Sequence, residues 1–165
     1  MGCGKNKGGL DMRKLPIGIQ SFEKLRENDY VYVDKTKYIW DLSNTGKAYF
    51  LSRPRRFGNS LLISTMKAYF EGKKELFKDL EIEKFEDESD EPWTKYPIIY
   101  MSFAMGNYTH EGELELKLNS ILRECANEYG VFDNPDDSLG DRFFLLIKNI
   151  KEYIKGFLWH IERGR

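Results

Sequence analysis

The sequence predicts an α/β fold, and two observations predict it. A short apolar run over residues 48–51 leads through a polar turn into a helix-like segment over residues 60–70. A second apolar run over residues 98–103 precedes two long segments with helical periodicity. Runs this short suit buried strands, and an uninterrupted apolar run suits a parallel strand that is buried on both faces.

Before the polar turn, the sequence predicts alternating short elements. They are a helix over residues 22–27, a strand over 30–33, a helix over 37–42 and the strand over 48–51. Ser21 and Thr36 stand where a side chain can cap the first turn of each helix. Asp34 ends the alternating β-forming residues that precede Thr36.

After the turn, the helix over residues 60–70 ends at Gly72, because a glycine commonly follows the last periodic residue. The remaining predicted elements are a short helix or turn over residues 73–77, a solvated acidic loop over 86–91, the strand over 98–103, and helices over 111–129 and 139–154. Gly130 ends the first long helix and Ser138 caps the second. Both helices carry an apolar stripe that predicts one buried face.

The polar turn over residues 52–59 has the setting of a phosphate-binding loop. A helix that follows such a turn offers free N–H groups and a positive dipole end to an anion. On the pattern G-x-x-x-x-G-K-[ST], Arg53 occupies the first glycine, Gly58 the second, Asn59 the lysine and Ser60 the hydroxyl position. The alternative is that this arginine-rich loop is a basic surface turn.

Three separated phrases of the sequence resemble a known family. RPRRFGNS at residues 53–60, followed by LLISTMKAYFEGKKELF, resembles AAA-ATPase-like proteins of gut and anaerobic microbes, in which the first phrase usually reads RPRRFGKS. The opening phrases KLPIGIQ and YVYVDKT are present at residues 14–20 and 30–36. Because separated phrases match in order, the resemblance is specific, and it covers roughly residues 12–150. It implies a P-loop NTPase with a three-layer α/β core of parallel strands, usually followed by a PD-(D/E)XK nuclease-like domain.

The chain departs from the family pattern in two ways. Asn59 stands at the position of the P-loop lysine, and no apolar strand ending in acidic residues (a Walker B phrase) follows. We therefore expect residues 12–165 to be the N-terminal part of an AAA-ATPase-like domain, with its core incomplete at the C-terminal side. Residues 1–11 are expected to be a disordered extension.

The resemblance implies an ATP site with impaired hydrolysis. The residues expected to bind the nucleotide are Arg53, Pro54, Arg55, Arg56, Phe57, Gly58, Asn59 and Ser60, together with Asp34, Lys35 and Thr36. The hydroxyl of Ser60 is the expected Mg²⁺ ligand, and the arginines can pair with phosphate oxygens. No catalytic residue is assigned, because the acid that holds Mg²⁺ and the residue that orients water have no recognisable phrase. Alternatively, Asp34 does not bind the nucleotide and only marks the end of a strand.

Composition narrows the classes of function. A length of 165 residues suits one domain, and an apolar share of 41% is sufficient for a core. The net charge of −1 argues against a polycation that binds nucleic acid over its whole surface. Cys3 and Cys125 lie far apart without ligand spacing, so neither a disulfide framework nor a zinc site is expected. Without a membrane-spanning run or a signal peptide, we predict a cytoplasmic protein with no membrane partner.

Two alternatives to nucleotide binding remain open. The basic loop, with nearby Lys67, Lys73 and Lys74, could bind nucleic acid or another protein. An inactive truncated product is the other alternative. In that case, a parallel sheet with an exposed edge would favour self-association.

Overall fold

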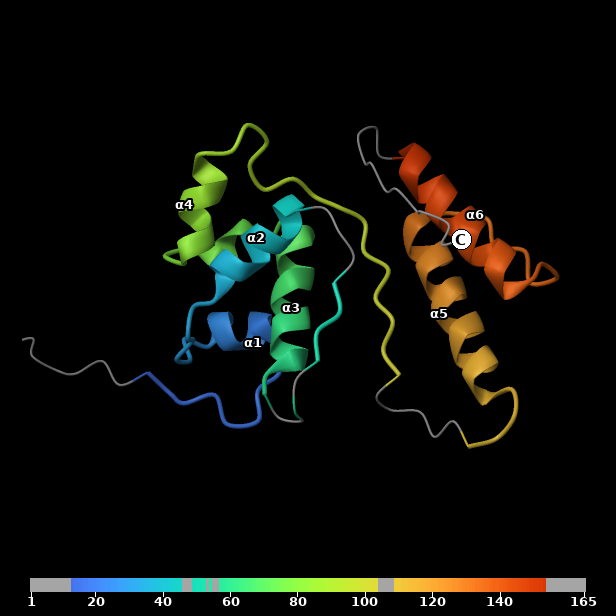
Figure 1. The fold of residues 1–165 in the computed structure, drawn as a ribbon, viewed down its shortest axis with the longest axis horizontal. Coiled ribbons are helices and arrows are strands. Elements are labelled where there is room, and N and C mark those ends of the chain that lie inside the picture. Colours follow the sequence, from blue (N-terminus) through green and yellow to red (C-terminus); the bar gives the residue numbers. More distant parts are fainter. Residues whose placement is uncertain (1–12, 46–48, 53, 55–56, 104–108, 154–165) are drawn as a thin grey trace, which may run out of the picture. The chain divides into compact units, whose positions relative to one another are not determined.

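The structure is a computed structural model that describes residues 13–45, 49–52, 54, 57–103 and 109–153. The predicted extension over residues 1–11 lies outside these ranges. The described chain is helical (Figure 1). Its helices are α1 (Phe22–Glu27), α2 (Thr36–Thr45), α3 (Asn59–Phe70), the 3₁₀ helix η1 (Lys74–Phe77), α4 (Glu81–Asp87), α5 (Glu113–Tyr129) and α6 (Leu139–Tyr153).

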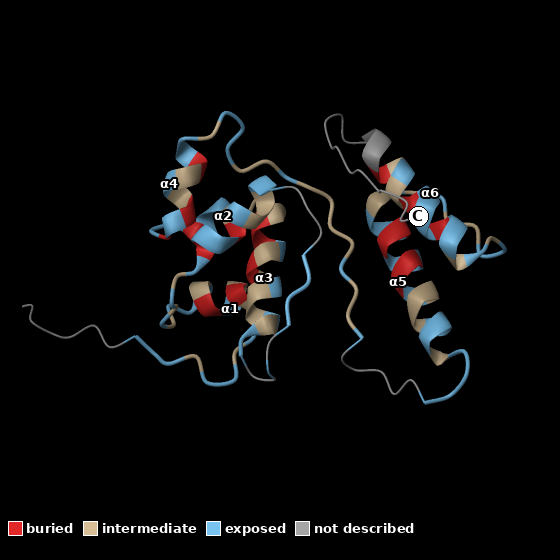
Figure 2. Ribbon diagram, viewed as in Figure 1, coloured by how far each residue is buried: buried red, intermediate tan, exposed pale blue. Residues whose placement is uncertain are grey.

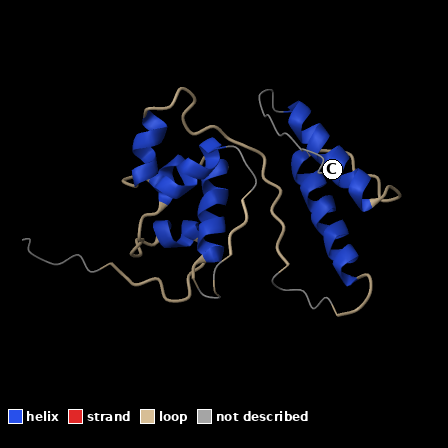
Figure 3. Ribbon diagram, in the orientation of Figure 1, coloured by secondary structure: helices blue, strands red, loops and turns tan. Residues whose placement is uncertain are grey.

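The predicted α/β fold with a three-layer core of parallel strands is wrong for the described residues, which contain no strand (Figure 3). The β-type contact found there is an isolated parallel bridge between Lys14 and Tyr30. Residues 49–51 and 98–103 belong to no regular element. A strand is stable only when neighbouring strands satisfy its backbone groups, and no such set of paired strands forms within the described ranges. Self-association through a sheet edge consequently has no basis in the described part.

The chain divides into two compact units, one ending at Ile98 and one beginning at Ile99. In the first unit, α1 packs on α3 and η1, and α2 packs on α4. Buried residues lie on all of these helices (Figure 2). The core of this unit consists of Phe22, Ile39, Ala68, Tyr69, Leu76, Phe77, Leu80 and Ile82.

Polar contacts fix α1 within the first unit. The hydroxyl of Ser21 accepts a hydrogen bond from the Lys24 N–H at 3.3 Å, which confirms the predicted cap. At the other end, the guanidinium of Arg26 donates to the carbonyl oxygens of Leu76 at 2.7 Å and Lys78 at 2.6 Å. Charged donors make stronger hydrogen bonds than neutral ones, so Arg26 holds α1 firmly against η1.

The prediction of a solvated acidic loop over residues 86–91 is wrong at Glu86. This residue lies near the end of α4 and is only 3% exposed. Its carboxylate accepts hydrogen bonds from the hydroxyl of Tyr69 and the N–H of Trp93. Burial, followed by the bond to Glu86, raises the pKa of Tyr69 well above its ordinary value. The buried carboxylate is therefore satisfied and belongs to the core.

The second unit is a hairpin of α5 and α6. Gly130 ends α5 with φ +63°, as predicted. The buried core of this hairpin consists of Ile121, Leu122, Cys125, Ala126, Leu146 and Ile150. Cys125 is a buried free thiol, and burial, with nearby acidic groups, raises its pKa.

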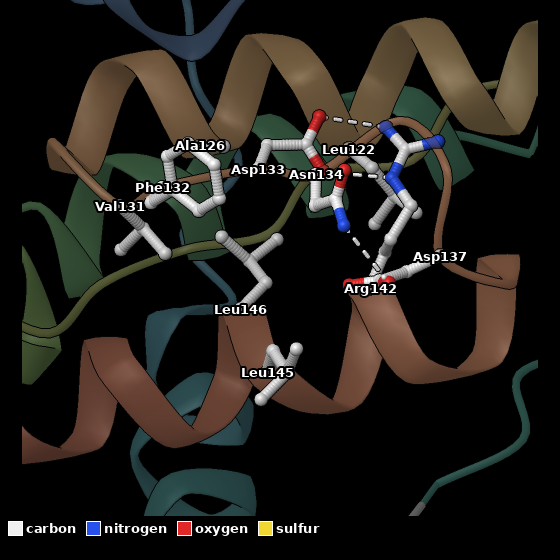
Figure 4. Close-up of a pocket in the computed structure, with 10 residues that line it drawn as sticks. All are labelled: Leu122, Ala126, Val131, Phe132, Asp133, Asn134, Asp137, Arg142, Leu145 and Leu146. Carbon is white, nitrogen blue, oxygen red and sulfur yellow. Dashed lines mark hydrogen bonds and ion pairs between the residues drawn. The ribbon is translucent and has the colours of Figure 1, made fainter.

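A buried ion pair joins the interhelical loop of this hairpin to α6 (Figure 4). The Arg142 side chain is 2% exposed, and its Nε and Nη2 donate to the two carboxylate oxygens of Asp133 at 2.7 and 2.6 Å. This guanidinium holds the pKa of Asp133 below its ordinary value. The small cavity beside the pair leaves no room for a ligand, at about 10 Å³.

Candidate nucleotide-binding site

The start of α3 has the geometry that an anion requires. Gly58 precedes the helix with φ +80°, a backbone conformation that favours glycine. The first hydrogen bond of the helix runs from the Leu62 N–H to the Gly58 carbonyl oxygen at 2.9 Å. No side chain caps this start in the described residues. The N–H groups of Asn59, Ser60 and Leu61 therefore lack intrahelical partners and are available to an anion.

A hollow of about 810 Å³ adjoins this helix start. Pockets that hold small molecules typically measure roughly 300–1,000 Å³ and are mostly apolar. The lining residues are Pro16, Leu25, Val31, Tyr32, Val33, Lys35, Tyr38, Asp41, Leu42, Thr45, Tyr49, Phe50, Leu51, Phe57, Gly58, Leu61, Leu62, Ile63, Thr65 and Met66. By volume and lining, this hollow can accommodate a ligand of nucleotide size.

The hollow follows α3 for much of its length. Its lining includes Gly58 at one end and Met66, eight residues later, at the other. At 1.5 Å per residue, these positions are about 12 Å apart along the helix. A ligand that meets the start of α3 can therefore also extend along the side of this helix.

Two predicted site residues, Asp34 and Thr36, join the starts of α2 and α4. The Asp34 carboxylate accepts hydrogen bonds from the Thr36 N–H at 2.8 Å, the Thr36 hydroxyl at 2.7 Å and the Glu81 N–H at 2.6 Å. The Thr36 hydroxyl, which is fully buried, accepts from the Ile82 N–H at 3.1 Å. These contacts give both residues a structural role. Their contact with a nucleotide stays a prediction.

The predicted loop residues are only partly described. Arg53, Arg55 and Arg56 lie outside the described residues. Pro54 is exposed, and Phe57 is 67% exposed at the edge of the hollow. The structure thus brings Phe57 and Gly58 to the hollow, together with Lys35 from the start of α2.

Asn59 and Ser60 occupy the first turn of α3. The side-chain oxygen of Asn59 is buried and receives no hydrogen bond from the described residues. Ser60 is exposed, as a Mg²⁺ ligand at this position would need to be. Across the described ranges, no group of three or more His, Cys, Asp or Glu side chains could hold a metal ion. Ser60 as a metal ligand stays a prediction.

The part of the hollow that α2 lines was not predicted from the sequence. Tyr38, Asp41 and Thr45 line it, and Lys35 lies directly before the helix. The spacing of these residues, three or four positions apart, places them on one helical face. This periodicity was the available signal. The apolar stripe of α2 could not reveal it, because most of these residues are polar.

A helix start that no described side chain caps, beside a mostly apolar hollow, is a setting in which a phosphorylated ligand can bind. A family model described as "Predicted AAA-ATPase" matches residues 16–158, so the chain belongs to the AAA-ATPase-like family. It is also 42% identical over 124 residues to an uncharacterized protein in the vnfD 5′ region of Azotobacter chroococcum mcd 1. That match covers 74% of this chain and 23% of the relative, so the chain spans about a quarter of the relative's length.

No solved structure matches the chain. Within the described residues, no helix is both long and apolar enough to cross a membrane.

Proposed function

We propose that this chain binds ATP, with the phosphates at the start of α3 and the base and ribose in the adjoining hollow. We further propose that it hydrolyses ATP slowly at most. The observation that carries the proposal is that Gly58, the residue preceding the uncapped helix, also lines the hollow. One ligand can therefore meet the free N–H groups and the apolar walls at the same time.

The start of α3 suits the phosphates on physical grounds. Its first N–H groups have no partners in the helix, and the helix dipole adds a partial positive charge at this end. Gly58 carries no side chain, and a Cβ built there would meet nothing within 4 Å. A phosphate can thus approach the backbone closely.

Aromatic side chains in the wall of the hollow suit the base. Tyr32, Tyr38 and Tyr49 line it, and Tyr38 is 64% exposed. A base that stacks on such a ring gains roughly 1–3 kcal/mol, judging from stacking in nucleic-acid-binding proteins. Since every base has a flat face, the aromatic rings alone leave the nucleotide preference open.

Slow hydrolysis follows from Asn59. Phosphoryl transfer depends on positive charge that stabilises the transferred phosphoryl group, and an asparagine amide carries none. Loss of a single group that stabilises the transition state typically lowers kcat by roughly 10²–10³-fold. Binding depends less on this charge, because the backbone N–H groups remain.

Thermal melting with and without ATP and Mg²⁺ tests the proposal. We expect ATP to raise the melting temperature of the wild-type protein, and to raise that of Asn59→Lys further. A ligand at 100 times its Kd stabilises the folded state by about 2.7 kcal/mol. Asn127→Lys, at an exposed position of α5 that does not line the hollow, adds the same charge and serves as the control. If neither the wild-type protein nor Asn59→Lys responds to ATP, the proposal is refuted.

A further inference from the structure

We infer that Lys35 supplies, at the phosphates of the bound nucleotide, the positive charge that Asn59 lacks. The inference rests on the proposed function and gives Lys35, which lies outside the phosphate-binding loop, a specific role at the phosphates. It is carried by the position of Lys35 in the wall of the hollow, which Gly58 also lines. Lys35 and Gly58, the residue that precedes α3, thus line the same hollow.

The charges around the hollow single out Lys35. Among the described lining residues, Lys35 and Asp41 are the formally charged ones. The carboxylate of Asp41 is already paired with Lys37, whose Nζ lies 2.6 Å from it. Within the described ranges, Lys35 forms no ion pair and is exposed. It is the lining cation that remains available to an anionic ligand.

The backbone of Lys35 is held in place from both sides. Asp34 before it bonds to the starts of α2 and α4, and Thr36 after it is buried and bonded to Ile82. A fixed backbone leaves only side-chain entropy to be lost when the ammonium group meets a phosphate. Lysine is a compact charge on a flexible four-carbon stem and can therefore adjust to the position of the phosphates.

Calorimetric titration of ATP and of adenosine tests this role. We expect Lys35→Gln to weaken ATP binding by about 10- to 100-fold, the loss typical of a hydrogen bond to a charged group. Adenosine has no phosphate, so its affinity is expected to stay unchanged. The control is Lys24→Gln, because Lys24 is exposed on α1 and does not line the hollow. The melting temperature without ligand establishes that each variant is folded.

A double variant tests whether a lysine at the position of Asn59 can take over the role of Lys35. If Lys35 replaces the missing loop lysine, adding Asn59→Lys to Lys35→Gln restores ATP affinity. A double variant that binds ATP no better than Lys35→Gln overturns the inference. So does Lys35→Gln with unchanged ATP affinity, or with equal losses for ATP and adenosine. In those cases ATP binding by the wild-type protein still supports the proposed function, whereas a wild-type protein that binds no nucleotide refutes both.

Discussion

Replacing Thr36 by valine is expected to lower the free energy of unfolding of the first unit by about 2–4 kcal/mol. Valine has nearly the shape of threonine but lacks the hydroxyl group. Thr36 is fully buried, so water cannot replace the contacts that the hydroxyl makes. The variant therefore isolates the polar link between α2 and α4.

The magnitude follows from the two hydrogen bonds that are lost. The Ile82 N–H, which donates to the Thr36 hydroxyl at 3.1 Å, is left buried without an acceptor, at a cost of about 1–3 kcal/mol. The bond from the hydroxyl to Asp34 at 2.7 Å contributes about 1 kcal/mol more. Thr36→Ser, the matched control, keeps both bonds and loses one buried methyl group, which costs about 1 kcal/mol.

Urea unfolding followed by tryptophan fluorescence measures the difference. Trp40 on α2 stacks on Phe85 of α4 with ring centroids 5.8 Å apart, so its emission reports on the two helices that the link joins. At a urea m-value of about 2 kcal/mol/M, Thr36→Val shifts the midpoint by about 1–2 M. A valine variant at least as stable as Thr36→Ser would refute the reasoning, because the hydroxyl would then contribute nothing.

Two further predictions concern stability. Arg142→Met is expected to cost about 3–5 kcal/mol in urea unfolding, because it leaves the Asp133 carboxylate without its buried partner. The folded protein holds the pKa of Asp133 below its ordinary value, so the ion pair stabilises the fold above about pH 4. This stabilisation is lost as the pH falls through the folded-state pKa. If the free energy of unfolding of Arg142→Met fell with acid as steeply as that of the wild-type protein, this prediction would be contradicted. Gly72→Ala is expected to cost more in thermal melts than Gly130→Ala. Both glycines have positive φ, but a Cβ at Gly72 would lie 3.2 Å from the Trp93 carbonyl oxygen, whereas one at Gly130 meets nothing within 4 Å. Equal losses would contradict the argument from crowding.

Local sequence signals predicted most of the helices, but not α4 (Glu81–Asp87). The Ser21 cap placed α1 at its observed bounds, and the periodic segments before Gly72 and Gly130 contain α3 and α5 almost to the residue. Capping and periodicity act between residues three or four positions apart, so the sequence itself contains the information. The strands were predicted wrongly because strand formation depends on partners distant in the sequence, which a local apolar pattern cannot specify.

The site was only partly predictable for the same reason. The position of Gly58 before a helix follows from the loop pattern, and the structure gives it the expected helix start. The hollow depends on how α2 and residues 49–51 lie beside α3, so the sequence did not reveal it. Glu86 was misjudged because an acidic run suggests solvent, whereas Tyr69 and Trp93 satisfy this one carboxylate inside the core.

The most direct test of the account is a titration of the ¹⁵N-labelled protein with ATP, followed by the backbone amide resonances. If the phosphates bind at the start of α3, the largest chemical-shift changes occur at Gly58, Asn59, Ser60 and Leu61, with smaller changes at residues that line the hollow. Phosphate contact acts directly on those N–H groups, which the helix leaves without partners. Changes confined to the second unit, or no change at saturating ATP, would contradict the claim that the start of α3 binds the phosphates.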